Sequence, residues 1–199
     1  MTHLTTTQEN SMRIAVDLDN VVFEWLEAFT EYTNIRFGHS DDHYGFKQWD
    51  YWQQDGVELT EDEFMTAFDD FSRYRMWQSI ELSPFAREAL CSIDSMGHQI
   101  FYLTSRPRSE SMATVKSIIH NGLPFHGILF LDEKAEIAEA LDIGVGIDDN
   151  IKQLDAYVEH NICPVVYRRS NNMHWEVPDF GFEVNNLMEF VNVIHLLSP

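Results

Sequence analysis

Short apolar runs alternate with longer stretches of helical character along most of the chain, and this alternation restricts the possible folds more than any other feature. Apolar runs that stop at polar residues are typical of buried strands, and they fall at 13–18, 99–103, 128–131, 145–147 and 164–167. The intervening stretches predict helices at 22–37, 83–97, 110–120, 133–141 and 151–159. Strands that alternate with helices form parallel sheets with crossover helices. We therefore expect an α/β fold with a doubly wound, mainly parallel sheet.

Two of these helices have clear end signals, and one long segment interrupts the alternation. Ser83 before Pro84 predicts a helix start, and Gly97 predicts its end. Thr60 and Glu63 form a capping-box pattern inside an aromatic-rich segment that has no strand-like run. We expect this segment to be a small helical cap over one end of the sheet. The predicted organisation is a loose N-terminal tail at 1–11, an α/β core at 12–37 and 81–199, and the cap at 38–80.

The charge balance excludes several classes of partner. Among 199 residues, Lys and Arg number 13 and Asp and Glu number 33, so the formal net charge is -20. Such a surface repels nucleic-acid polymers and anionic membranes, although a cation with a few basic side chains can still hold one phosphate group. Cys91 and Cys163 do not suggest a disulfide framework, and no run approaches about 18 consecutive apolar residues. We expect a cytoplasmic protein that binds neither nucleic-acid polymers nor membranes.

Two acids follow the first predicted strand directly. Asp17 and Asp19 lie two residues apart where the apolar run stops. Ligands of open α/β sheets bind beyond the carboxyl ends of the strands, so these acids are suitably placed for chemistry. The alternative is that Asp19 caps the next helix and Asp17 is an incidental turn acid.

Polar side chains also follow the later strands. Thr104, Ser105 and Arg106 offer hydroxyl and guanidinium donors suited to phosphoryl oxygens. Asp148 and Asp149 form a second acidic pair that could complete an oxygen-ligand site for Mg²⁺. Lys134 lies between these groups in the sequence, where a fixed cation could bind a phosphoryl group. Each has an ordinary alternative as a cap, a turn acid or a solvated charge, but their order at successive strand ends favours one site.

This ordered set resembles the haloacid dehalogenase superfamily of aspartate-nucleophile phosphohydrolases over roughly residues 12–167. The family pattern has Asp-x-Asp after the first strand, Thr or Ser after the second, then a Lys and an acidic pair, which fall here on Asp17, Asp19, Thr104, Lys134, Asp148 and Asp149. The position of the insertion and the YLTSRP and IDD runs are most similar to the 5'(3')-deoxyribonucleotidases. The chain departs from many members at Asn20, where they have Gly, although Asn also tolerates unusual backbone angles.

The resemblance implies a Mg²⁺-dependent phosphomonoester hydrolase. Asp17 is the implied nucleophile that forms an aspartyl-phosphate, and Asp19 the implied acid and base. Lys134 is expected to help keep the nucleophile ionised. Mg²⁺ is expected to bind Asp17, the backbone carbonyl of Asp19 and Asp149, while Asp148 ligates or acts from the second shell.

The expected substrate is a small phosphate ester, and the resemblance favours a (deoxy)nucleoside monophosphate. Thr104, Ser105 and Arg106 are candidates to bind its phosphate. A flat base could stack on the cap aromatics Phe46, Trp49, Trp52 or Trp77, with Trp49 and Trp52 as the leading candidates. Such rings, however, usually pack within a domain's own core. Arg168 and Arg169, with Asn171 and Asn172, form a basic spot near the last predicted strand, which is either a substrate-side loop or a solvated turn. The alternatives are a phosphatase for another small phosphate, such as a sugar phosphate, and a catalytically silent binding protein.

Overall fold

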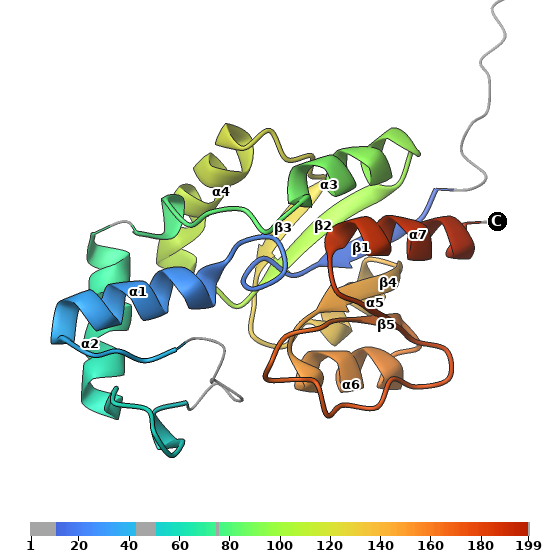
Figure 1. Ribbon diagram of the computed structural model, residues 1–199. Helices are drawn as coiled ribbons and strands as arrows, with labels where there is room; N and C mark the ends of the chain where they lie inside the picture. The colour runs from blue at the N-terminus through green and yellow to red at the C-terminus, as the bar shows by residue number, and fades with distance from the viewer. Residues whose placement is uncertain (1–10, 43–50, 75, 199) are drawn as a thin grey trace, which may run out of the picture.

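A six-stranded sheet forms the centre of the computed structural model, which describes residues 11–42, 51–74 and 76–198 (Figure 1). The strand order is β3-β2-β1-β4-β5-β6, and every neighbouring pair is parallel. The strands are β1 (Arg13–Val16), β2 (Gln99–Thr104), β3 (Gly127–Phe130), β4 (Ile143–Asp148), β5 (Cys163–Tyr167) and β6 (Phe182–Val184). Because all strands are parallel, their carboxyl ends lie along one edge of the sheet. The predicted fold class is confirmed.

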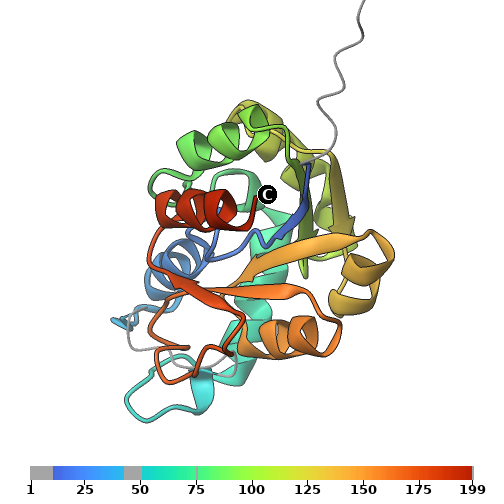
Figure 2. The same ribbon diagram turned by 90° about the vertical axis from the view of Figure 1, so that its right-hand side faces the viewer.

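Helices cover both faces of this sheet, as Figure 2 shows. Ile14, Ile100 and Val145 belong to the apolar core on the face covered by α3 (Ala86–Ser95) and α7 (Leu187–Leu197). Ala15, Leu103 and Val166 belong to the smaller core on the other face, beneath α5 (Ala135–Ala140) and α6 (Ile151–Glu159). Alternate residues along each strand thus serve opposite layers. The remaining elements are α1 (Trp25–Phe37), α2 (Glu61–Arg73), α4 (Ser111–His120), η2 (Tyr51–Gln53), η3 (Met76–Gln78) and η4 (Arg108–Glu110).

The described parts of the aromatic segment, 38–42, 51–74 and 76–80, contribute to a helical layer that stands apart from the sheet in Figure 1. Thr60 and Glu63 form the predicted capping box at the start of α2. The ring of Phe29 on α1 makes edge contacts with Phe64 and Phe71 on α2, at centroid distances of 5.3 and 5.6 Å. Helix α1 therefore packs with the segment that follows it, and we propose to count α1 as part of the cap together with 38–80.

Several element boundaries differ from the prediction for tertiary reasons. Helix α1 begins at Trp25 rather than near residue 22, because the backbone N–H groups of Val22 and Phe23 both donate to the carbonyl oxygen of Leu18 in a tight turn. The predicted cap Ser83 is wrong. Its N–H donates to the carbonyl of Val22, and α3 begins later, at Ala86.

Strand β6 and helix α7 follow the last predicted strand and are not among the predicted elements. Strand β6 spans Phe182–Val184 and is too short to show a period-two pattern. Helix α7 does carry a start signal, because the side chain of Asn186 accepts a hydrogen bond from the N–H of Glu189. Of the predicted tail at 1–11, only Ser11 lies within the described residues. Across the described ranges, no helix combines the length and apolar character needed to span a bilayer.

We predict that Gly146→Ala destabilises the protein and that Gly144→Ala, on the same strand, does not. A Cβ at residue 146 would lie 2.5 Å from the ring of Tyr157 on α6, whereas a Cβ at residue 144 meets nothing within 4 Å. Overpacking of this kind costs about 1–3 kcal/mol in the free energy of unfolding. Urea unfolding of both variants checks this, and equal stabilities would contradict the close packing of α6 on β4.

Candidate active site

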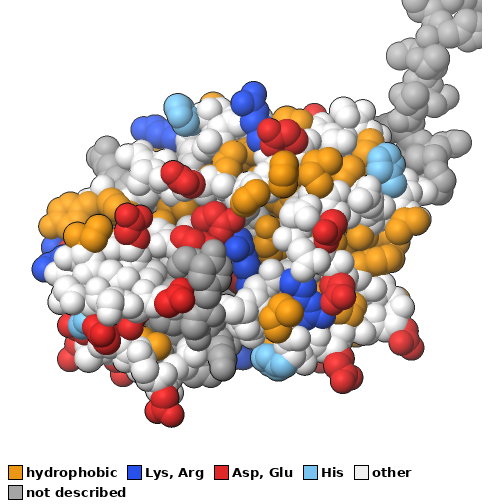
Figure 3. All heavy atoms as spheres, in the orientation of Figure 1, with side chains coloured by type: hydrophobic (Ala, Val, Ile, Leu, Met, Phe, Trp, Pro, Cys, Tyr) orange, Lys and Arg blue, Asp and Glu red, His pale blue; other side chains and the backbone are white. Residues whose placement is uncertain are grey.

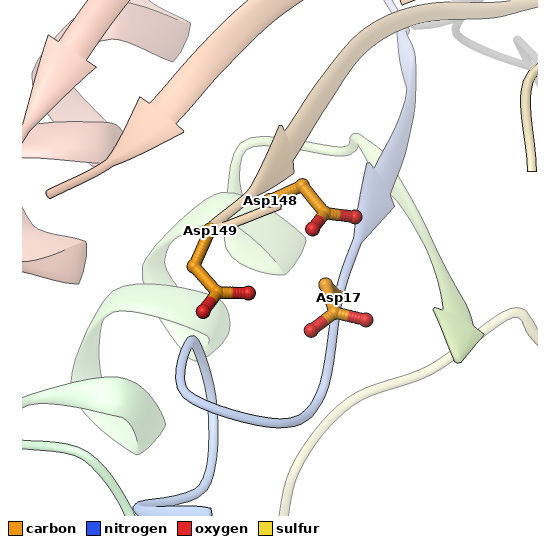
Figure 4. A group of neighbouring side chains, drawn as sticks. All are labelled: Asp17, Asp148 and Asp149. Carbon is orange, nitrogen blue, oxygen red and sulfur yellow. The ribbon is translucent and has the colours of Figure 1, made fainter. Parts of the chain in front are cut away.

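Three carboxylates from two adjacent strands meet at the carboxyl edge of the sheet. Asp17 follows β1, and Asp148 and Asp149 come from the end of β4, which pairs with β1 (Figure 4). The backbone N–H of Asp17 extends this pairing by donating to the carbonyl of Ile147 at 3.0 Å. One oxygen from each carboxylate lies within 4.8 Å of the other two, and all three residues are buried. We call these three residues the acidic cluster.

Lys134 places its ammonium group against two members of the acidic cluster. Its Nζ lies 2.5 Å from Oδ1 of Asp17 and 2.7 Å from Oδ2 of Asp148. Burial by itself would lower the pKa of Lys134, but the carboxylates of Asp148 and Asp17 outweigh it and raise the pKa well above its usual value. Gln153 on α6 fixes the Lys134 loop by accepting from the N–H of Lys134 and donating to the carbonyl of Asp132. Lys134 is therefore a fixed and permanently charged group.

The acidic cluster carries more negative charge than Lys134 can balance. Burial, followed by the negative charge of Asp148, raises the pKa of Asp149 to about 7. Burial also raises the pKa of Asp17 well above its usual value, although Lys134 acts in the opposite direction. Three ionised carboxylates beside one ammonium leave two negative charges, and buried charges of this kind need compensation.

A divalent cation fits this donor set. Carboxylate oxygens are the ligands that Mg²⁺ prefers, and two positive charges would offset the excess. Asp17 and Asp149 are the better candidates for direct ligation. Both oxygens of Asp148 are already used, because Oδ2 accepts from Lys134 and Oδ1 accepts from the N–H of Asn150 at 2.9 Å. Asp148 is therefore better placed to orient Lys134 than to ligate a cation directly.

Asp19 is held by a buried arginine, outside the acidic cluster. Nε and Nη2 of Arg106 donate to the carboxylate of Asp19 at 2.6–3.0 Å. The guanidinium carbon also lies 4.9 Å from the ring centre of Phe23 and 5.2 Å from that of Trp77. The predicted phosphate ligand Arg106 is thus engaged inside the protein and fixes the direction of Asp19.

The two hydroxyls after β2 have different surroundings. Thr104 is fully buried, and its Oγ1 accepts from the N–H of Arg106 at 3.2 Å, which closes the turn. Ser105 is exposed, and its Oγ donates to the carbonyl of Leu131 at 3.4 Å. Both lie at the carboxyl end of β2, next to β1 and therefore on the same edge as Asp17.

The aromatic candidates separate clearly. Trp49 lies outside the described residues. Trp52 packs on Phe64 of α2 with ring centres 4.5 Å apart, and Trp77 is 2% exposed. The described cap rings therefore belong mainly to the cap's own core.

No protein-family model matches the chain, but two curated relatives match part of it. A Bacillus cereus protein named "Putative nucleotidase" is 28% identical over 100 residues, which are 48% of this chain and 53% of that protein. An Oceanobacillus iheyensis protein, also named "Putative nucleotidase", is 27% identical over 120 residues, 57% of this chain and 63% of that protein. The chain thus spans between about half and two thirds of the length of these relatives.

Solved structures match almost the whole chain. A haloacid dehalogenase-like hydrolase from Streptococcus pneumoniae has a TM-score of 0.63 at 18% identity, with 92% of this chain and 98% of that chain covered. A predicted phosphoglycolate phosphatase from Haemophilus somnus has a TM-score of 0.62 at 16% identity, with 92% and 97% covered. The chain has the haloacid dehalogenase fold.

The resemblance that the motif order predicts is therefore confirmed at the level of the haloacid dehalogenase fold. The fold alone does not name the reaction. An L-2-haloacid dehalogenase also matches, with a TM-score of 0.61 at 9% identity, 92% of this chain and 99% of that chain being covered. The chemistry must be argued from the side chains at the site.

Two residues in the loop after β5 support the site from behind. Asn172 is fully buried, and its amide donates to the carbonyl of Asp149 at 2.8 Å. Arg169, which the sequence leaves as a substrate-side loop or a solvated turn, pairs with Glu24 at 2.9 Å. The sequence locates both residues just after the last predicted strand, but their partners Asp149 and Glu24 are distant in the chain and are known only from the fold.

We predict that Asp149→Asn stabilises the cation-free protein at pH 8 and stabilises it much less at pH 5. The folded-state pKa of Asp149, about 7, lies above the unfolded value of about 4, so deprotonation destabilises the folded state as pH rises through this interval. Asn removes that cost, which for three pKa units is about 4 kcal/mol in the free energy of unfolding at pH 8 and about 1 kcal/mol at pH 5.

Urea unfolding in EDTA at both pH values measures this difference. Asp142→Asn is a matched control, because Asp142 is exposed at the opposite edge of the sheet and its φ of 57° is one that Asn adopts readily. A loss of stability in Asp149→Asn at pH 8 would contradict the argument from excess buried charge.

Proposed function

We propose that the protein is a Mg²⁺-dependent phosphomonoester hydrolase that acts through an aspartyl-phosphate on Asp17. The observation that carries this proposal is the placement of Asp17 between a fixed ammonium and a second pair of acids. A nucleophilic carboxylate needs positive charge beside it to approach a phosphate dianion, and the Lys134 ammonium supplies it. An acidic cluster without that cation would repel the substrate.

The proposed reaction has two steps. An oxygen of Asp17 attacks phosphorus, the bond from phosphorus to the ester oxygen breaks, and the alkoxide leaves. Water then attacks phosphorus, which releases inorganic phosphate and regenerates the Asp17 carboxylate. Lys134 contacts Asp17 directly and would also neutralise the non-bridging phosphoryl oxygens. The divalent cation, when bound by Asp17 and Asp149, supplies further neutralisation of those oxygens.

Asp19 is the proposed proton donor to the leaving alkoxide and acceptor of a proton from water. In the structure Arg106 engages both of its oxygens. The side chain of Asp19 remains 22% exposed, and we propose that it turns away from Arg106 when a substrate enters. Thr104 and Ser105, at the end of β2, are the proposed phosphate-side donors. In this structure, Arg106 orients the carboxylate of Asp19 and is not itself free to bind the phosphate.

A nucleoside monophosphate is the proposed substrate class. Both curated relatives carry nucleotidase names, and the cap inserted after β1 is rich in aromatic residues. Bases are flat and stack on such rings. Of the two leading candidates, we propose Trp49 as the stacking residue, because Trp52 already packs on Phe64.

We predict that Asp17→Asn abolishes phosphate release. An amide is a very weak nucleophile, so we expect a fall in kcat of at least about 10³-fold. Release of inorganic phosphate from a panel of nucleoside monophosphates and sugar phosphates, with Mg²⁺ and with EDTA, measures this. Asp142→Asn should retain full activity. If the wild-type protein hydrolyses no ester in the panel, the silent binding protein becomes the better description, and turnover of sugar phosphates alone would refute the nucleotidase assignment.

We predict that Trp49→Ala raises KM for a nucleoside monophosphate several-fold and leaves turnover of a small aryl phosphate unchanged. Loss of a stacking ring costs about 1–3 kcal/mol per base. By contrast, Trp52→Ala should lower thermal stability, because it removes a ring from the cap core. Equal losses on both substrates in Trp49→Ala would show a structural role for Trp49.

A further inference from the structure

Asn20 joins three parts of the protein that meet beside the acidic cluster. It follows Asp19 directly and adopts a left-handed backbone conformation with φ 64°. Its side-chain Nδ2 donates to Oδ2 of Asp149 at 3.2 Å. Its Oδ1 accepts from the backbone N–H of Leu26, in the first turn of α1, at 2.9 Å. A single amide therefore spans from a carboxylate of the acidic cluster to the first turn of a cap helix.

The contact with Leu26 supplies a missing helix cap. The first N–H groups of a helix have no partner within the helix and need an acceptor from elsewhere. Glu24 is the residue in the N-cap position of α1, and within the described chain it makes no side-chain capping bond. Asn20 provides the acceptor from the preceding turn. The start of α1 thus depends on the same side chain that contacts Asp149.

Arg169, in the loop after β5, fixes this arrangement from the other side. Its Nε donates to the backbone carbonyl of Asn20 at 2.9 Å, and its Nη2 contacts both oxygens of Glu24 at 2.9 and 3.0 Å. The N–H of Arg169 donates to Oδ1 of Asn172, whose amide in turn donates to the carbonyl of Asp149. Asp149 is consequently held at both its side chain and its backbone by one connected set of hydrogen bonds.

We propose that Asn20 is a positioning residue that couples the orientation of Asp149 to the seating of α1, so that cation binding and cap seating favour one another. This inference rests on the cation site of the proposed function. Groups that hydrogen-bond to metal ligands orient those ligands, and their loss typically weakens metal binding by 10–100-fold. Because the same amide also accepts from the first turn of α1, a shift of Asp149 alters the position of α1, and a shift of α1 alters the orientation of Asp149.

The backbone conformation alone does not account for Asn20. A position with φ 64° is adopted more readily by glycine than by asparagine. Glycine would therefore form the turn at least as well. What asparagine adds is the side-chain amide, and both of its polar atoms are used, one on Asp149 and one on Leu26.

Asn20→Gly tests this role with little backbone cost, and Asn161→Gly is a matched control. Asn161 also has a left-handed conformation, with φ 57°, and is exposed between α6 and β5. Electron paramagnetic resonance of Mn²⁺ measures cation affinity without substrate or turnover. We expect Asn20→Gly to weaken Mn²⁺ binding by about 10-fold and Asn161→Gly to leave it unchanged.

Arg169→Gln separates positioning from simple electrostatics. The positive charge of Arg169 acts on Asp149, so its removal alone would strengthen cation binding. The proposal predicts the opposite sign, a several-fold weaker Mn²⁺ affinity, because Asn20 and Asn172 lose their support. Tighter binding in Arg169→Gln would count against the proposal.

Amide hydrogen exchange tests the coupling to the cap. In the wild-type protein and in Asn161→Gly, Mg²⁺ should slow exchange of the first-turn amides of α1, including Leu26. In Asn20→Gly this slowing should be absent. Wild-type Mn²⁺ affinity in Asn20→Gly, or an equal loss in Asn161→Gly, would overturn the proposal. Absence of Mn²⁺ binding in the wild-type protein would also overturn this proposal, whether or not the protein hydrolyses phosphate esters. Mn²⁺ binding without hydrolysis would refute only the proposed function.

Discussion

The burial of three carboxylates beside one ammonium is the constraint on which the rest of this structure depends. Such an arrangement is unfavourable in isolation, because burial and mutual repulsion oppose ionisation, and the raised pKa of Asp149 expresses that cost. It persists because the surrounding sheet and helices stabilise it. In the proposed function, the same excess of negative charge would attract a cation and, through that cation, a phosphate. Acidic side chains are also spread over the face seen in Figure 3, so attraction of an anionic substrate has to be local.

The parallel sheet is what brings these groups together. Strands β1 and β4 are neighbours although more than a hundred residues separate them, and their carboxyl ends place Asp17 next to Asp148 and Asp149. Helix α5 then presents Lys134, and α6 fixes the Lys134 loop through Gln153. Rigid elements thus carry the charged groups of the proposed reaction, which limits the reorganisation that phosphoryl transfer would require.

The cap is joined to this rigid centre through polar contacts as well as through its aromatic core. Trp25 stacks on Trp77 at 6.2 Å, and Trp77 in turn lies against the guanidinium of Arg106. Arg106 holds Asp19, while Asn20 and Arg169 hold the start of α1. Asp19 and Asn20 therefore each connect the site to the cap. Asp19 does so through Arg106 and Trp77, and Asn20 does so through the N–H of Leu26. In this protein the cap and the acidic cluster are parts of one hydrogen-bonded system.

The sequence by itself determined the fold class and the candidate acids, because alternating apolar runs and the residues that end them are local properties. It predicted α6 with its observed bounds and the capping box of Thr60 and Glu63 for the same reason. It missed β6 and α7. The contacts of Arg106 with Asp19, of Asn172 with Asp149 and of Arg169 with Glu24 could be seen only in the folded chain. Those partners are far apart in the chain, and nothing in local periodicity or spacing records which buried charges will meet once the sheet has formed.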